Sequence, residues 1–125
     1  MRRTTIIAAG FAAFSMLALA GPALAGFGAL AHDDDSGKYG LSSNEESQAK
    51  ADDVAMKECG GDKCKIVFRT VARQCGAIAV AETGGSSAWG GGKAPQRAAA
   101  ELEAMTSCQK HTKGHCKIRG AECNR

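Results

Sequence analysis

The chain has 125 residues, of which 44% are hydrophobic, and a formal net charge of +3. Without Arg2 and Arg3, which lie in a segment expected to be cleaved, fourteen basic and thirteen acidic residues remain, a net charge of +1. A balance this close to neutral argues against nucleic-acid or membrane-surface binding driven by bulk charge. The remaining length of about one hundred residues suffices for one domain.

Residues 1–25 have the three parts of a secretory signal peptide. They comprise a basic end, an uncharged and largely apolar middle, and an A-x-A cleavage site at Ala23 and Ala25. We expect cleavage after Ala25, which leaves a periplasmic or secreted domain of residues 26–125. Sec and twin-arginine export both stay open. A retained membrane helix is disfavoured, because a glycine-proline pair interrupts a run shorter than the roughly 20 residues that a span needs.

The first half of the mature chain reads as strand, turn, strand, helix, strand. An apolar run at 27–31, a turn at 33–37 and a returning stretch at 38–41 predict a hairpin. Ser43 then begins an S-N-E-E capping box, which predicts the start of a helix. Small residues recur at spacings of four at Ala51, Ala55 and Cys59, which predicts the buried face of that helix. The glycine pair Gly60 and Gly61 predicts its end. The β-branched run 64–71 reads as a buried strand.

The second half repeats this plan. Strand 75–81, a turn at 83–85 and a return through Ala88 and Trp89 lead to a helix that opens at Pro95. The small-residue stripe recurs at Ala100, Ala104 and Cys108. The last strand, 116–123, reads as shorter and more polar than its counterpart, which suggests an edge.

The two halves therefore form an internal repeat of ββαβ units, residues 26–74 and 75–125. The stretch Phe27–Asp34 aligns with Cys75–Glu82, and the motif around Cys59 and Cys64 aligns with that around Cys108 and Cys116. This pattern predicts an α+β domain, a mostly antiparallel sheet of about six strands with two helices on one face.

All six cysteines lie in the mature part, which predicts three disulfides in an oxidising compartment. Six cysteines allow fifteen pairings, and sequence alone does not choose among them. The symmetry of the repeat favours joining Cys59 to Cys64 and Cys108 to Cys116, which leaves Cys75 for Cys123. The last bridge would fasten the first strand of the second unit to its final strand, whereas Phe27 at the equivalent position can simply be packed.

Paired G-A-[IL]-A openings, an alanine-rich helix ending in cysteine and C-K-[IV] strands resemble the domain of unknown function family 4189, found in small exported bacterial proteins. The resemblance covers essentially the whole mature chain. It implies fold and export rather than an activity. The chain departs from the family's aromatic-rich hairpins, since Tyr39 and Trp89 stand alone. The motif positions are Gly28, Ala29, Ala31, Cys59, Cys64, Gly76, Ala77, Ala79, Trp89, Cys108 and Cys116.

Three motifs suggest ligands, and each has a simpler interpretation. His111 and His115, with Cys59 and Cys64, could imitate a zinc site, but exported cysteines favour disulfides. The acidic run 33–37 could hold calcium but lacks the glycine and glutamate of an EF-hand, so a solvated turn is favoured. The G-G-G-K run 90–93 resembles a phosphate loop only superficially and reads as a flexible strand-to-helix turn. We therefore expect no metal and no cofactor.

Two hypotheses about function remain. The sequence leaves open whether the chain is an enzyme, and it favours a non-enzymatic role. In the first, a monomeric module binds another protein or a cell-envelope component, for example as an inhibitor or immunity-type protein. Its second half carries seven basic and four acidic residues against seven and nine in the first, and the contact residues we expect are Lys110, His111, Lys113, Lys117, Arg119, Tyr39 and Trp89. In the alternative, His32 with His111 or His115 serves a small secreted hydrolase, such as a nuclease.

Overall fold

The computed structural model describes residues 26–82 and 88–125. The expected signal peptide and the expected turn at 83–85 lie outside these residues. Six strands and two helices follow one another as β1 Phe27–His32, β2 Tyr39–Glu45, α1 Gln48–Cys59, β3 Lys65–Thr70, β4 Cys75–Ala81, β5 Trp89–Ala94, α2 Arg97–Gln109 and β6 Cys116–Cys123. This order confirms two consecutive ββαβ units in an α+β fold.

Each unit forms its own antiparallel sheet, with its first strand in the centre. The strand orders are β2-β1-β3 and β5-β4-β6. The units agree even in an irregularity, since the register with the last strand shifts between Leu30 and Ala31 in one and between Ile78 and Ala79 in the other. The repeat inferred from sequence is therefore a repeat of three-dimensional structure.

The helices lie against the sheets through the expected small residues. Ala51, Ala55 and Cys59 are buried on α1, and their equivalents are buried on α2. The start of α1 differs from the prediction: Ser43 lies in β2, and Ser47 caps the helix by accepting a hydrogen bond from the Lys50 amide. The helix ends as expected at Gly60, whose φ of 65° is left-handed.

The α2 helix begins two residues later than predicted. Pro95 lies outside it, Gln96 is its N-cap residue, and Arg97 is its first residue. The α2 helix has thirteen residues against twelve in α1, and its N-cap residue makes no side-chain hydrogen bond. The buried face, rather than the capping residue, is what the two units share.

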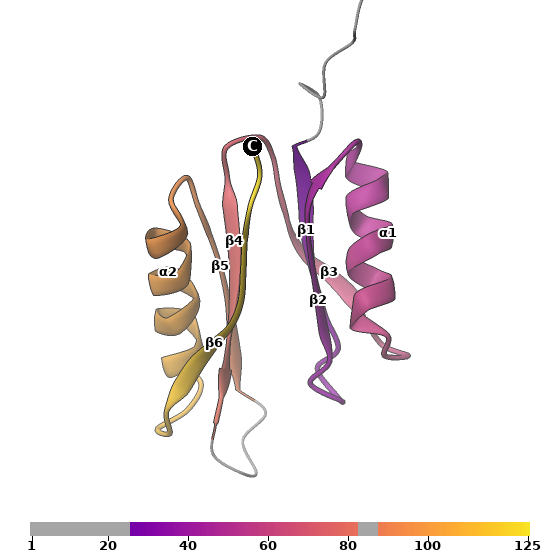
Figure 1. Cartoon of the computed structure of the whole chain (residues 1–125). Helices are drawn as coiled ribbons and strands as arrows, with labels where there is room; N and C mark the ends of the chain where they lie inside the picture. The colour runs from indigo at the N-terminus through magenta and orange to yellow at the C-terminus, as the bar shows by residue number, and fades with distance from the viewer. Residues whose placement is uncertain (1–25, 83–87) are drawn as a thin grey trace, which may run out of the picture.

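The prediction of one six-stranded sheet with both helices on one face is wrong. Figure 1 shows four layers, α2, the β5-β4-β6 sheet, the β2-β1-β3 sheet and α1. The central strands β1 and β4 are buried on both faces, because alanines face the helix while Leu30 and Ile78 face the other sheet. Each unit thus covers one side of its sheet with its own helix and the other side with its partner unit.

Contact between the sheets depends on a difference in side-chain size. The first unit supplies Leu41 and Phe68, whereas the second has Gly91 and Gly120 at the equivalent strand positions. A methyl group at Gly91 would lie 2.9 Å from the Phe68 ring, too close for an ordinary contact. The large side chains of one unit therefore fill space that glycines leave in the other.

The three disulfides are those that the repeat predicted. Cys59–Cys64 and Cys108–Cys116 each join a helix end to the next strand, and Cys75–Cys123 joins the paired strands β4 and β6. β6 is an edge strand as expected, but its eight residues make it longer than β3, which has six. The bridge thus fastens a full-length edge strand, not a short one.

Candidate functional site

Three of the turns that join the strands and helices lie at the end of the molecule opposite the C-terminus (Figure 1). The β1–β2 and α1–β3 turns of the first unit lie there, as does the α2–β6 turn of the second. Both short disulfides lie beside these turns. Because turns carried by a rigid scaffold are common binding sites, this end is the candidate functional region.

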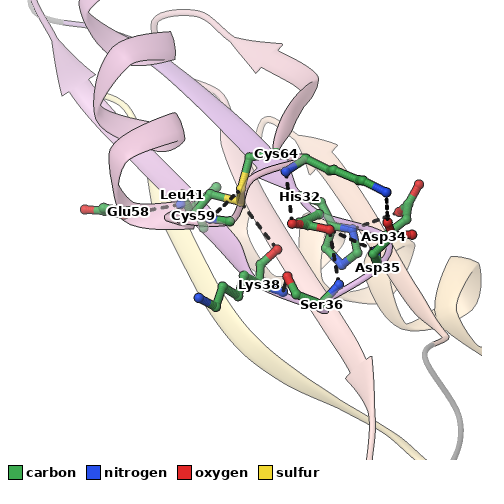
Figure 2. The surroundings of a disulfide bond; sticks show 12 residues. His32, Asp34, Asp35, Ser36, Lys38, Leu41, Glu58, Cys59 and Cys64 are labelled. Atoms are coloured by element: carbon green, nitrogen blue, oxygen red, sulfur yellow. Dashed lines mark hydrogen bonds and ion pairs between the residues drawn. A yellow bond between two sulfur atoms is a disulfide. The ribbon is translucent and has the colours of Figure 1, made fainter.

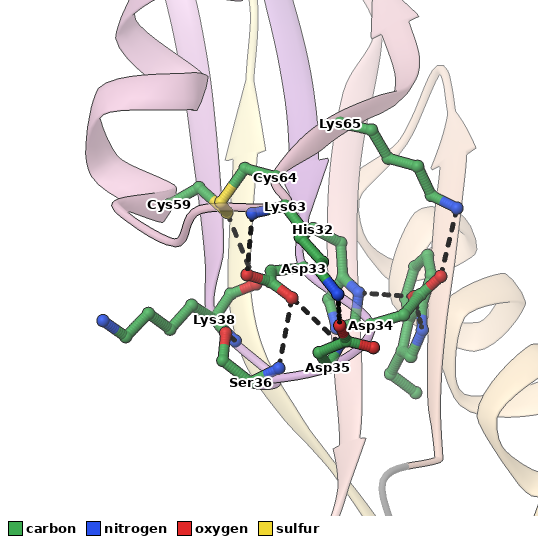
Figure 3. Close-up of polar contacts among 11 residues, drawn as sticks. His32, Asp33, Asp34, Asp35, Ser36, Lys38, Cys59, Lys63, Cys64 and Lys65 are labelled. Atoms are coloured by element: carbon green, nitrogen blue, oxygen red, sulfur yellow. Dashed lines mark hydrogen bonds and ion pairs between the residues drawn. A yellow bond between two sulfur atoms is a disulfide. The ribbon is translucent and has the colours of Figure 1, made fainter.

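The acidic run 33–37 is a hairpin turn, as favoured from the sequence. The Asp33 side chain is buried and accepts hydrogen bonds from the amides of Asp35 at 2.9 Å, Ser36 at 3.1 Å and Lys63 at 3.2 Å (Figure 3). These donors, the Ser36 amide first, hold the pKa of Asp33 below its usual value. The carboxylate is therefore an internal tie between two turns.

Asp34 joins the first unit to the second. Its Oδ1 lies 2.9 Å from His32 Nδ1 and accepts a hydrogen bond of 3.1 Å from Trp89 Nε1, while Lys65 Nζ lies 3.0 Å from Oδ2 (Figure 3). The contact with Lys65, followed by that with His32, lowers the pKa of Asp34. The His32 and Trp89 rings stack with centroids 4.0 Å apart.

The Cys59–Cys64 disulfide fixes the turn on which this network depends. The Gly61 amide donates to Cys64 Sγ at 3.1 Å, and Lys63 pairs with Asp35 at 2.6 Å. Figure 2 shows the bridge beside the β1–β2 turn. The two turns border a hollow of about 330 Å³, but its carboxylates at 33 and 35 already have partners within the chain.

The three histidines do not share one environment. His32 ends β1 and is only 2% exposed, whereas His111 and His115 are exposed in the α2–β6 turn of the other unit. A general acid must reach its substrate, and His32 is covered by the Trp89 ring. The geometry therefore gives no support to an acid–base pair that includes His32.

The zinc alternative is excluded by the cysteines. Cys59 and Cys64 are joined to each other, so neither offers a thiolate. Within residues 26–82 and 88–125, no group of three or more histidine, cysteine or acidic side chains is arranged to hold a metal ion.

The G-G-G-K run is neither a phosphate loop nor a turn. It lies inside β5, where it pairs with β4. Gly90 and Gly92 face the backbone of α2, and a methyl group at either would collide with it. These glycines allow a helix to approach a strand closely.

In the described part of the chain, the basic residues of the α2–β6 turn and of β6 have no carboxylate counter-ion, whereas four of the seven Lys and Arg residues of the first unit are paired. In the described part of the chain, all five contacts between a basic side chain and a carboxylate lie in the first unit. The exposed residues that we call the basic surface have no such contact there: Lys110, His111, Lys113, Lys117 and Arg119.

The two aromatic residues expected to bind a partner make contacts between the units. Trp89 stacks on His32, and the Tyr39 hydroxyl donates to the Arg119 carbonyl at 3.4 Å. Carbonyls of β6 also accept hydrogen bonds from Arg97 and Asn44 side chains. Side chains thus occupy hydrogen-bonding groups of this edge strand, which opposes the addition of a further strand.

Sequence reasoning missed Asp34 and Lys65, which complete the network around His32. Lys65 lies opposite His32 in the register of β1 and β3. The run of three aspartates directly after His32 was the available signal. It could not show which carboxylate turns toward the second unit, because that depends on how the two sheets pack.

A family model described as a domain of unknown function, DUF4189, matches residues 27–123. The chain belongs to this family. The match runs from the first residue of β1 to the last residue of β6, so both units and all three disulfides of the DUF4189 domain fall inside it. The resemblance drawn from the sequence motifs is thereby confirmed.

The DUF4189 domain is similar to a solved structure, the NMR structure of Rv1813c from Mycobacterium tuberculosis. The identity is 27% and the TM-score is 0.59, with 99% of this chain and 100% of that chain covered. No curated protein matches the chain. In residues 26–82 and 88–125, no helix is long and apolar enough to cross a membrane, and three disulfides are typical of proteins folded outside the reducing cytosol.

Proposed function

We propose that the protein is an exported, non-enzymatic binding module that recognises an anionic partner, a protein or a cell-envelope component, through its basic surface. The observation that carries the proposal is the gathering of exposed basic side chains without a counter-ion in one turn and in the strand that follows it. Lys57, Lys63 and Lys65 are paired with aspartates, whereas Lys110 and Lys113 have no carboxylate within 4.0 Å in the described part of the chain. Unpaired exposed cations attract an anionic surface and speed its association.

The fold supports this role by holding the surface rigidly. The Cys108–Cys116 bridge closes the turn that carries Lys110 and Lys113. The Gln109 side chain spans the same turn, donating to the Gly114 carbonyl and accepting from the Cys116 amide. A turn ordered in advance loses little conformational entropy on binding.

The test compares charge reversals in the two units. The mature protein is passed over immobilised polyglutamate and over an anionic phosphate polymer at low salt, and binding is measured by interferometry. Lys110→Glu with Lys113→Glu should weaken binding about tenfold or more, because two attractions become repulsions. The control, Lys38→Glu with Lys50→Glu, makes the same charge change in the first unit and should bind like the wild type.

Two results would contradict the proposal. The first is equal weakening by both double variants, which would show that only net charge matters. The second is a nuclease activity on RNA that is lost in His111→Ala or His115→Ala, which would favour the enzymatic alternative. We expect no RNA cleavage that depends on His111 or His115.

A further inference from the structure

The outer face of α2 differs from the equivalent face of α1. Aligning Cys59 with Cys108 places Lys50, Asp53 and Lys57 over Ala99, Leu102 and Thr106. On α1 these positions carry three charges, and Asp53 pairs with Lys57 at 3.1 Å. On α2 the same exposed positions carry none.

This uncharged strip borders a hollow and leads into the basic surface. Leu102 is 68% exposed, the largest fraction among the exposed large apolar residues of the described chain. Ala99, Leu102, Thr106 and Lys110 line one hollow of about 520 Å³. A single exposed leucine is ordinary, but here a leucine, a hollow and an unpaired lysine lie in a row along the helix.

We propose that α2 and the α2–β6 turn form a docking groove for an acidic amphipathic helix of another protein, with apolar side chains on Leu102 and carboxylates at Lys110 and Lys113. The proposal rests on the proposed function and names its partner. Charge complementarity selects an acidic segment, and the apolar strip requires that the segment have an apolar face. Glu103 also lines the hollow, so the partner's carboxylates belong at the Lys110 end.

A bare polyanion would use only the lysines, so Leu102 separates the two kinds of partner. A partner helix would bury its own leucines against Leu102. A charged residue at this position removes the apolar surface that covers them. Thr106 and Ala99 contribute flat, small surfaces on either side, which let a second helix approach closely. Leu102→Asp also restores the residue type of the equivalent position, Asp53, which suits a helix surface.

The probe is a synthetic peptide of about 18 residues, long enough to form a helix on binding. Leucines at spacings of three and four define one face, and glutamates gather at one end. A scrambled peptide of identical composition lacks the apolar face. Affinities for the full mature protein are measured by fluorescence anisotropy at about 50 and 300 mM salt.

We expect the amphipathic peptide to bind about tenfold more tightly than the scrambled one, and Leu102→Asp to remove that difference. Val71→Asp is the matched control, since Val71 is 48% exposed in the turn between β3 and β4. This variant should bind like the wild type. Circular dichroism and near-wild-type unfolding midpoints confirm that each variant is folded.

The outcomes separate this inference from the proposed function. Equal binding of both peptides, lost on Lys110→Glu but unaffected by Leu102→Asp, would overturn the helix partner and leave the basic surface standing. Binding to vesicles of anionic phospholipid that depends on Leu102, without preference between the peptides, would also overturn it. Binding of no anionic probe through Lys110 or Lys113 would overturn both.

Discussion

At the scale of single residues, His32 illustrates how the two units have diverged at an equivalent position. His32 is the last residue of β1, and Val80 occupies the equivalent position of β4. Both side chains face the opposite sheet. Valine needs no polar partner, whereas a buried imidazole does. Asp34 and the Trp89 ring supply that partner and the packing surface, so His32 holds the units together at the turn end.

His32→Ala should therefore destabilise the protein by about 2 kcal/mol, because it leaves a gap against Trp89 and removes a hydrogen-bond partner of Asp34. Trp89 is the single tryptophan of the chain, so its emission reports on this contact directly. Urea unfolding followed by tryptophan fluorescence measures the loss, and a red-shifted native spectrum should accompany it. The exposed His111→Ala serves as control and should stay within about 0.5 kcal/mol of the wild type. Equal stability of the two variants would show that His32 does not join the units.

At the scale of strands and helices, close approach decides the packing of each unit. Gly40 on β2 and Gly90 on β5 are equivalent, and each faces the backbone of its helix one turn before the cysteine. A methyl group at Gly90 would meet the Cys108 amide and the Ala104 carbonyl, and Ser107 C at 2.8 Å. Neither backbone can yield without displacing the helix.

Gly90→Ala should cost about 3 kcal/mol of unfolding free energy, at the upper end of overpacking effects. Gly120→Ala is the matched control, since its methyl group would lie 3.6 Å from Leu41, an ordinary contact. That variant should lie within about 0.5 kcal/mol of the wild type. Urea denaturation of both measures the difference, and a Gly90→Ala protein as stable as the control would disprove the account.

The order and type of the elements were predictable from sequence, whereas some of their ends and their assembly into layers were not. The stripe of Ala51 and Ala55 and the glycine at position 60 are local signals, and the symmetry of the duplicated cysteines favoured the bridges that the structure has. The choice between one sheet and two depends on what covers the second face of β1 and β4. Alternation of alanines with Leu30 and Ile78 held that information, because small residues suit a close helix and large ones an opposing sheet.

The candidate site was partly predictable for the same reason. The basic residues after α2 could be counted, but their lack of counter-ions is a property of three-dimensional neighbours. Tyr39 and Trp89 stood out as lone aromatics, yet only the packing of the sheets reveals that each reaches the other unit. The sequence thus shows which basic and aromatic residues are present, whereas the contacts that each of them makes depend on the fold.

At the scale of the whole molecule, the domain combines thin alanine-rich layers with disulfides that contribute unequally to its stability. The buried core of each unit consists mostly of alanine and cysteine, which bury little apolar area per residue. The Asn124 side chain adds a polar tie, donating to Thr70 at 2.8 Å and accepting from the Asn44 amide at 2.8 Å. Such a domain depends on its bridges more than one with a large core.

The bridges should therefore contribute unequally to stability, because the loop-closure entropy grows with the logarithm of the loop length. Cys75–Cys123 spans 48 residues and Cys59–Cys64 spans five, for which loop entropy gives about 4 and about 2 kcal/mol. Replacing both cysteines of the long bridge by alanine should consequently cost about twice as much stability as replacing both of the short one. Urea unfolding of the two double variants, each with its remaining bridges verified by non-reducing peptide mapping, measures the ratio. A larger loss from removing Cys59–Cys64 would mean that the bridge acts mainly through the native turn, where it holds the Lys63 amide against Asp33, rather than through the unfolded chain.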